Sequence, residues 1–351
     1  MKMTIKSIFK LMGVAFISVA MLSCSKNESE PAQTKAIGFN TYTGRAISKA
    51  GNSLINKGTT TLAEGAKFVV YAYNTKNAAW AGTVSDVFMN GVTVTYEGGG
   101  ATDPDQYTYT PMRYWPNDEA NNKLSFFAYY PQGGQGITAP TNGWGGYSFT
   151  AQTNPKNMVD FCLSQVAADQ TYNSTNSGTK GVVNMKFYHT LTMVKFKVKT
   201  DAAYTGTTIT LKSISLAGVK TTGTLTPSNT TAAWTNQDNA TALDVFPTGS
   251  KVLSTTDVFV PTGTEIDDAY LMIPQTLGDN VVATITYTVK TGDDAEVTNT
   301  ATVKLNSDAT VKAWDMNKNI VYTFVVGLRP IKFIAEVNDW ADVQGASFNV
   351  N

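Results

Sequence analysis

Few residues of this chain are of the types that act as nucleophiles, general bases or metal ligands. It contains one histidine, His189, and two cysteines, Cys24 and Cys162. Nucleophilic catalysis by a Ser–His–Asp or Cys–His arrangement would have to use His189, and a zinc site usually needs several His and Cys ligands. His189 stands just before an alternating apolar stretch, so we interpret it as a structural hydrogen-bonding residue. The sequence therefore predicts no catalytic residue, no metal and no cofactor.

The acidic and aromatic residues offer only weak candidates for a catalytic or ligand-binding site. Asp267-Asp268 and Asp293-Asp294 are typical of turns, and Asp103-Pro104-Asp105 lacks the ligand spacing of a calcium-binding EF-hand loop. No carboxylate pair stands out for sugar hydrolysis. Trp80 and Trp144, flanked by alanine and glycine, are the candidates for exposed rings that contact a ligand.

The start of the chain has the form of an export signal. Three lysines within the first ten residues precede an apolar run, 11–22, which is shorter than the roughly 20 residues of a membrane-spanning helix. The run ends in Met21-Leu22-Ser23-Cys24, which is similar to a bacterial lipobox. We expect a signal peptide over 1–23, acylation of Cys24 with lipid including palmitate, and a flexible tether over 24–35. The alternative is an ordinary secretory signal with an incidental cysteine.

Charge and cysteine content exclude some classes of partner and of stabilisation. The formal net charge is zero, and no basic stripe suggests a nucleic-acid partner. If Cys24 is acylated, Cys162 has no disulfide partner. An exported chain without disulfides must be stabilised by its hydrophobic core.

Alternating apolar residues predict β-strands, most clearly in the second half of the chain. Val194, Phe196 and Val198 alternate with lysines, and residues 281–289 alternate with threonines. In 207–216 the apolar phase changes at Lys212-Ser213, which predicts a β-bulge. Further strands are expected after a turn at 291–294 and in two closing segments, 320–326 and 331–337.

The first half shows the same chemistry less regularly. Strands are expected over 67–74 and 124–130. In the stretch 86–96, Asn90-Gly91 stands between two β-forming runs and predicts a hairpin turn. Helical periodicity is weak, and 155–168 is the one place where a short helix is expected.

Many short strands separated by turn residues indicate an all-β fold built from sandwiches. About 330 residues remain after the signal, enough for two domains. The polar segment 173–180 (NSTNSGTK) is the best linker. We therefore predict an N-terminal β-sandwich over 36–180 and a C-terminal β-sandwich over 181–351.

Four segments resemble the fimbrillin family, the lipoprotein-derived subunits of type V pili. They are YWPNDEANNKLSFFAYYP at 114–131, YHTLTMVKFKV at 188–198, YLMIPQ at 270–275 and IKFIAEVNDW at 331–340. The resemblance implies two tandem transthyretin-like, Greek-key β-sandwiches of about seven strands each. It also implies a cell-surface pilus subunit, of the stalk, the tip or an accessory position, and not an enzyme.

The resemblance further implies an assembly route. Family members reach the outer membrane as lipoproteins, and an arginine-specific protease then releases the first strand together with its lipid. A strand from another fimbrillin subunit fills the vacated groove. In this chain the removable strand is 36–42, with Ile37 and Phe39 in one phase, and cleavage maps to Arg45–Ala46.

The end of the chain supplies the expected donor strand. Ala346, Phe348 and Val350 alternate in one phase and could fill a groove in the next subunit. The predicted function is therefore a pilus subunit that supports adhesion. The alternative is a monomeric surface lipoprotein that binds glycans through Trp80 and Trp144.

Overall fold

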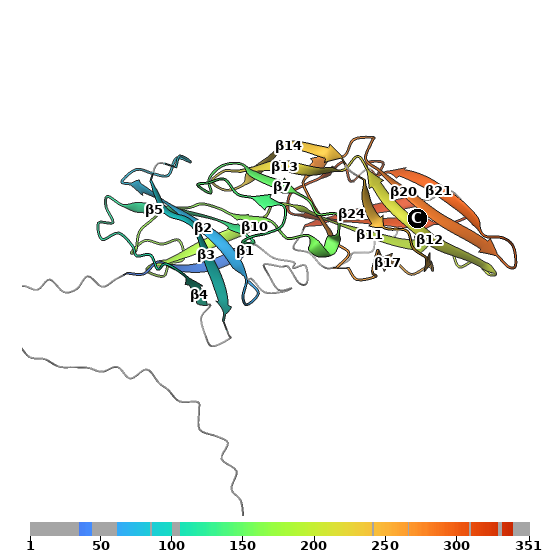
Figure 1. Ribbon diagram of the computed structural model, residues 1–351, viewed down its shortest axis with the longest axis horizontal. Helices are drawn as coiled ribbons and strands as arrows, with labels where there is room; N and C mark the ends of the chain where they lie inside the picture. The colour runs from blue at the N-terminus through green and yellow to red at the C-terminus, as the bar shows by residue number, and fades with distance from the viewer. Residues whose placement is uncertain are drawn as a thin grey trace, which may run out of the picture. The chain divides into compact units, whose positions relative to one another are not determined.

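β-Branched and aromatic residues are abundant in the chain, and its regular secondary structure consists almost entirely of strands. The computed structural model (Figure 1) describes residues 35–43, 62–84, 86–99, 106–240, 242–265, 267–308, 310–328 and 332–339. Among these residues the single helical element is a 3₁₀ turn, η1 (Pro155–Asn157). The prediction of an all-β fold is confirmed.

The first half of the chain forms an eight-stranded sheet. Its strands run, in spatial order, β1 (Gly38–Thr43), β10 (Val182–His189), β8 (Cys162–Ser164), β5 (Lys123–Tyr130), β2 (Lys67–Lys76), β3 (Val87–Gly98) and β4 (Gln106–Tyr109), with β9 (Ala167–Gln170) paired to β5. β1 runs parallel to β10, and the other pairs in this sheet are antiparallel.

This sheet curls until its two edge strands approach each other. The hydroxyl of Tyr109, at the end of β4, donates to the carbonyl oxygen of Ile37, just before β1, at 2.7 Å. The enclosed face carries an apolar core that includes Phe39, Phe68 and Phe126. Enclosure on one side explains why β1 buries every second residue.

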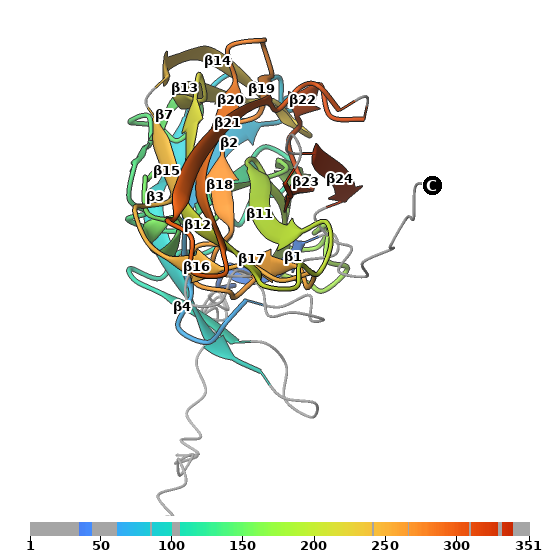
Figure 2. The same cartoon turned by 90° about the vertical axis from the view of Figure 1, so that its right-hand side faces the viewer.

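The second half forms two further sheets packed face to face. One contains β17 (Val258–Phe259), β11 (Thr192–Thr200), β23 (Lys318–Val326) and β24 (Lys332–Asp339), with β18 (Tyr270–Met272) paired to β11. The other contains β15 (Leu243–Phe246), β12 (Thr207–Ala217), β20 (Val282–Thr291) and β21 (Val297–Lys304), with β16 (Lys251–Val252) paired to β12. Figure 2 shows β11, β23 and β24 in sequence along their sheet.

Two smaller sheets complete the fold. The first contains β14 (Ala232–Ala240), β13 (Lys220–Pro227), β7 (Tyr147–Thr150) and β6 (Ile137–Thr138), and the second pairs β19 (Gln275–Thr276) with β22 (Ala313–Trp314). Because β13 pairs with β7, strands from the two halves of the sequence share one sheet. The core is shared too, since Tyr147 and Phe324 belong to the same buried apolar cluster.

The local sequence signals have mixed outcomes. The bulge at Lys212-Ser213 is confirmed, because the pairing of β12 with β20 shifts register between Leu211 and Ser213. The hairpin at Asn90-Gly91 is wrong, because β3 continues through it. Gly91 has φ of +67° and lies where the register with β2 shifts, so this glycine supports a bulge instead. The helix over 155–168 is limited to η1, and β8 and β9 follow it.

The sheet pairing also bears on the proposed domain division. β10 begins two residues beyond the predicted boundary at 180 and belongs to the first sheet. The change to the second half comes at Thr190 and Leu191, between β10 and β11. We propose the division there; the described residues from Lys35 onward otherwise form one compact unit. The transthyretin-like topology stays a prediction. Among the described residues, no helix is long and apolar enough to cross a membrane.

Candidate assembly groove

The groove that holds β1 is the candidate functional site. β1 lies at the edge of the eight-stranded sheet and pairs with β10 in parallel, from Gly38 beside Val182 to Thr43 beside Phe187. Three alternate residues face the core: Ile37 is 1% exposed, Phe39 5% and Thr41 6%. The predicted alternation of the first strand is therefore confirmed.

Phe39 is the main apolar anchor of β1. Its ring makes edge contacts with Tyr109 at 5.4 Å and with Phe126 at 6.0 Å between centroids. Burial of a large apolar side chain such as Phe or Ile contributes about 1.5–3 kcal/mol. Ile37 and Phe39 together therefore hold β1 by several kcal/mol, and their removal would expose the apolar core beneath them.

The second edge of β1 is held much more sparsely than the first. Just before the strand, the amide of Ile37 donates to the carbonyl of Arg113, and the amide of Trp115 donates to the carbonyl of Lys35, both at 2.9 Å. Farther along, the Thr41 amide donates to the Tyr107 hydroxyl at 3.2 Å. Thr41 Oγ1 also hydrogen-bonds that hydroxyl at 2.8 Å. Along β1 itself, tyrosine hydroxyls take the place of a second strand ladder.

A buried polar cluster lies at the far end of β10. Nδ1 of His189 is 2.8 Å from a carboxylate oxygen of Asp160 and 3.6 Å from Sγ of Cys162. Asp, Cys and His are metal-ligand types, and their ligand atoms lie within 4.8 Å of one another. The sequence did not single out Asp160; the neighbouring positions of Cys162 and His189 on β8 and β10 bring the cluster together.

This cluster is unsuited to nucleophilic catalysis. Asp160 and Cys162 approach the same nitrogen of His189, so the ring does not stand between a nucleophile and an orienting acid. All three residues are at most 3% exposed. Burial raises the pKa of the Cys162 thiol, and the Asp160 carboxylate raises it further, so the thiol stays protonated at neutral pH. The contacts of His189 link the ends of β8 and β10, and its structural role stays a prediction.

A match to a known family accounts for this architecture. Residues 54–340 match the model of the fimbrillin-like family. The chain belongs to that family. It is 31% identical over 223 residues to the fimbrium subunit Fim1C of Phocaeicola vulgatus; the match covers 57% of this chain and 52%, about half, of that relative.

Solved structures agree with the fold of this fimbrillin-like protein. A fimbrial protein from Bacteroides vulgatus has a TM-score of 0.63 and 22% identity, covering 87% of this chain and 99% of that one. A candidate cell adhesion protein from Bacteroides uniformis has a TM-score of 0.52 and 16% identity, covering 87% and 97%. These relatives are described as fimbrial or cell adhesion proteins.

Several residues expected to act in assembly lie outside the described part of the fimbrillin-like chain. They are Cys24, Arg45, Ala46, Ala346, Phe348 and Val350. Lipidation, cleavage and donation through these residues stay predictions. The described part contributes Ile37, Phe39 and the groove that holds them.

The two candidate ligand-binding tryptophans are packed into the fimbrillin-like fold, so their predicted exposure is wrong. Trp80 is 8% exposed, stacks on Tyr73 at 5.2 Å, and donates through Nε1 to Asn229 at 2.9 Å. Trp144 is half-buried, contacts Trp80 edge-on at 5.3 Å, and donates through Nε1 to the Gly82 carbonyl at 2.8 Å. Their rings meet protein neighbours, and ligand contact through them stays a prediction.

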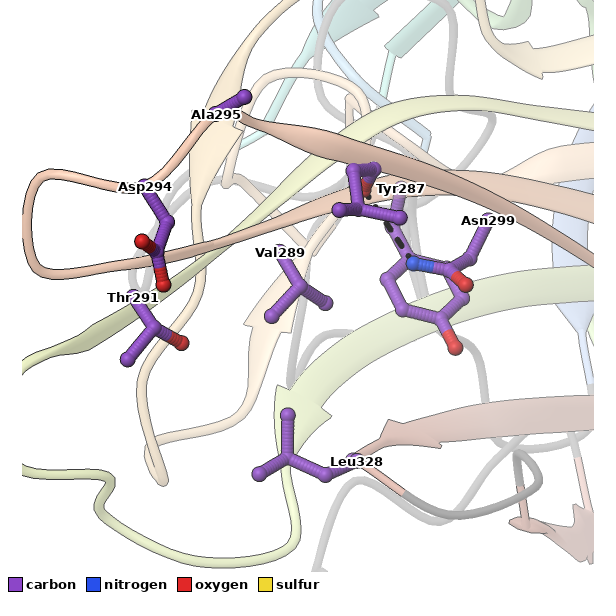
Figure 3. A pocket seen from close by; sticks show the side chains of 9 residues that line it. Tyr287, Val289, Thr291, Asp294, Ala295, Asn299 and Leu328 are labelled. Carbon is purple, nitrogen blue, oxygen red and sulfur yellow. Dashed lines mark hydrogen bonds between the residues drawn. The ribbon is translucent and has the colours of Figure 1, made fainter.

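The fimbrillin-like fold also has a shallow pocket of about 280 Å³ near the β20–β21 hairpin, shown in Figure 3. Its walls include Val297 and Leu328, which are 58% and 56% exposed, and the side chain of Asn299 donates to the Val297 carbonyl at 3.3 Å. Asp294 is the one carboxylate among the residues that line it. The pocket therefore lacks the carboxylate pair that sugar hydrolysis needs.

Proposed function

We propose that this fimbrillin-like protein is a pilus subunit that is exported as a lipoprotein through Cys24 and assembled at the outer membrane by strand exchange. Cleavage after Arg45 by an arginine-specific protease would separate β1 and the lipid from the rest of the chain. A strand from another subunit would then occupy the groove. The resulting surface pilus would support adhesion.

The observation that carries this proposal is the way β1 is held. Its buried side chains belong to the core, yet it is an edge strand with a full ladder on one side only. Loss of β1 would leave unpaired backbone groups along β10 and an open apolar slot where Ile37 and Phe39 lie. An incoming strand with the same alternation would pair the backbone groups of β10 and fill the apolar slot.

The small number of arginines makes the proposed cleavage testable. The chain has three, Arg45, Arg113 and Arg329, and Arg329 is followed by Pro330, a context that resists proteolysis. Arg113 has an exposed side chain, but its carbonyl accepts the Ile37 amide. We expect an arginine-specific protease to cut the folded chain after Arg45 and to convert it into SDS-resistant ladders.

The matched variants are Arg45→Lys and Arg113→Lys, which keep the charge and remove one cleavage site each. Arg45→Lys should abolish both the cut and the ladders, and Arg113→Lys should leave both unchanged. A chain that is cut after Arg45 and remains monomeric would contradict strand exchange. Ladders that form from uncut Arg45→Lys protein would contradict the protease trigger.

A further inference from the structure

The buried cluster of Asp160, Cys162 and His189 has the composition of a metal site. The sequence predicts no metal, because one histidine and two cysteines are too few for an ordinary zinc site. The fold nevertheless brings the histidine and one cysteine together with a carboxylate. We propose that these three side chains bind one divalent transition-metal ion, with Zn²⁺ as the best match. This proposal is independent of strand exchange.

The backbone holds the three residues in place before any metal arrives. Cys162 and His189 are direct cross-strand neighbours on β8 and β10, so their side chains leave the sheet on the same face. Asp160 lies two residues before Cys162, and its carboxylate reaches His189. Between them, the carbonyl oxygen of Phe161 accepts hydrogen bonds from the amide of Thr190 at 3.1 Å and from its Oγ1 at 2.5 Å. Metal binding therefore needs no rearrangement of the chain.

The distances between the ligand atoms are close to those of a tetrahedral zinc site. Zn–N bonds of about 2.0–2.1 Å and Zn–S bonds of about 2.3 Å place the nitrogen and the sulfur about 3.6 Å apart. Nδ1 of His189 and Sγ of Cys162 are 3.6 Å apart. The carboxylate oxygen of Asp160 is 2.8 Å from Nδ1, so it would move away by roughly 0.6 Å to reach its tetrahedral position.

The charges of the three ligands select a divalent ion. A Cys162 thiolate and the Asp160 carboxylate supply two negative charges, and the neutral imidazole of His189 supplies none. A divalent cation makes the complex neutral, which matters because all three residues are at most 3% exposed and a buried net charge is costly. Thiolate and imidazole together suit Zn²⁺ better than Mg²⁺ or Ca²⁺.

Protons leave the cluster when the metal binds. The metal–sulfur bond replaces the S–H bond of Cys162, and the thiol proton goes to solvent. The metal also takes the lone pair of His189 Nδ1, so the imidazole binds as the neutral ring with its proton on Nε2. No electron is transferred, because zinc has no redox chemistry.

One atom of the cluster lacks a hydrogen-bond partner. Oδ1 of Asp160 is buried and has none among the residues that the structure describes, whereas Oδ2 faces His189. A buried polar atom without a partner needs an explanation, and a bound ion supplies one. With both carboxylate oxygens, Sγ and Nδ1, three residues offer four donor atoms, the number that zinc usually takes.

A metal here would strengthen the strand that carries the assembly groove. β10 pairs with β1 along one edge and with β8 along the other, and His189 is its last residue. Cys162 is a free cysteine. A metal that joins Asp160 and Cys162 to His189 would link β8 to the end of β10 and stabilise the folded chain, since only the folded chain holds the three ligands together.

The experiment refolds the chain around the metal, because the closed cluster admits an ion most readily during folding. The full chain with Cys24→Ser, in which Cys162 is the only cysteine, is unfolded in denaturant with a chelator and refolded with Co²⁺, with Zn²⁺ or without metal. We expect one ion retained per chain after dialysis. The Co²⁺ form should show a sulfur-to-cobalt charge-transfer band, which only Cys162 can supply.

Variants of the ligands test the assignment. Cys162→Ser should abolish the charge-transfer band. Asp160→Asn should weaken metal binding by at least the 10–100-fold that is typical for loss of a group that merely supports a ligand. Asp294→Asn, the same substitution at an exposed residue of the β20–β21 turn, is the matched control and should bind as tightly as the parent chain. Hydrogen exchange of the β10 amides should be slower in the Zn²⁺ form than in the metal-free form.

The parent chain decides the proposal even where a variant fails to fold. Retained Co²⁺ with the sulfur band supports it. A refolded chain that retains no ion, or that retains Co²⁺ without the sulfur band, overturns it, as does equal binding by Asp160→Asn and Asp294→Asn. Metal analysis of the full chain purified from zinc-supplemented cells, without a chelator, repeats the test without refolding. Less than one ion per two chains would contradict the site.

Discussion

The two parallel strand pairs of the described chain invite comparison. β1 lies parallel to β10, and β23 lies parallel to β11. β23 is covered on its other side by the antiparallel β24, whereas β1 ends its sheet. β1 has six residues and β23 has nine. The same kind of parallel pairing thus has a further strand beside it in one sheet and lies at the edge of the other.

The two strands differ in the contacts that their removal would break. Removal of β23 would break two ladders and empty the core shared by β11 and β12. Removal of β1 would break one ladder and a few contacts to Arg113, Tyr107 and Tyr109. Local opening energies in proteins range from near zero to the global stability, and β1 belongs in the lower part of that range.

The largest expected effect on stability comes from a substitution in the pair β11–β23. Phe324 is fully buried in β23 and its ring stacks 6.2 Å from that of Phe196. Phe324→Ala should lower the free energy of unfolding by about 3–5 kcal/mol, measured by denaturant titration. Ile334→Ala, at a position of β24 that is 45% exposed, is the control and should change it little. A small effect of Phe324→Ala on the free energy of unfolding would show that β23 contributes little to the stability of the core.

A similar truncation in β1 should act locally. Phe39→Ala removes the ring contacts with Tyr109 and Phe126 and should favour opening of β1 by up to about 3 kcal/mol. Hydrogen exchange of β10 amides should accelerate strongly, while β23 amides change little. Equal acceleration in both strands would mean that β1 and β23 open together, and the comparison would fail.

Alkaline pH should release β1 through Tyr109. Burial raises the pKa of this phenol, so the folded state holds the proton more tightly than the unfolded state. The stabilisation is complete below the ordinary tyrosine pKa near 10 and is lost as pH rises through the raised value. The phenolate cannot donate to the Ile37 carbonyl. Cutting after Arg45 should therefore accelerate above pH 10, and a rate in Tyr109→Phe that rises equally would contradict this assignment.

The smallest effect should come from the same hydroxyl at neutral pH. Tyr109→Phe keeps the ring contact with Phe39 and removes the bond to Ile37, a loss of about 1 kcal/mol. Tyr114→Phe is the control, because that side chain is 45% exposed and lies on the same segment. Hydrogen exchange of β10 should increase in the first variant and stay unchanged in the second.

The sequence predicted what depends on neighbouring residues. Alternation at 194–198 and 281–289 corresponds to β11 and β20, and the phase change at Lys212-Ser213 corresponds to a bulge. The alternation of Ile37 and Phe39 correctly predicted a strand buried on one face. These patterns reflect local backbone geometry, which a single segment specifies by itself.

The errors concern contacts between distant residues. Trp80 is buried because its Nε1–H donates a hydrogen bond to Asn229, far along the chain, and Tyr73 covers its ring. Asn90-Gly91 supports a bulge instead of a hairpin because β3 continues along β2 on both sides of it. The sparse second edge of β1 depends on Tyr107 and Tyr109, whose role no local pattern predicts.

Hydrogen exchange with mass spectrometry on assembled ladders tests the exchange of β1 most directly. Peptides that cover Gly38–Thr43 should be absent from the ladders, while the amides of Val182–His189 remain as protected as in the uncut chain. That result requires another strand beside β10. Ladders that still contain the β1 peptide, or that leave the amides of β10 unprotected, would contradict strand exchange at this groove.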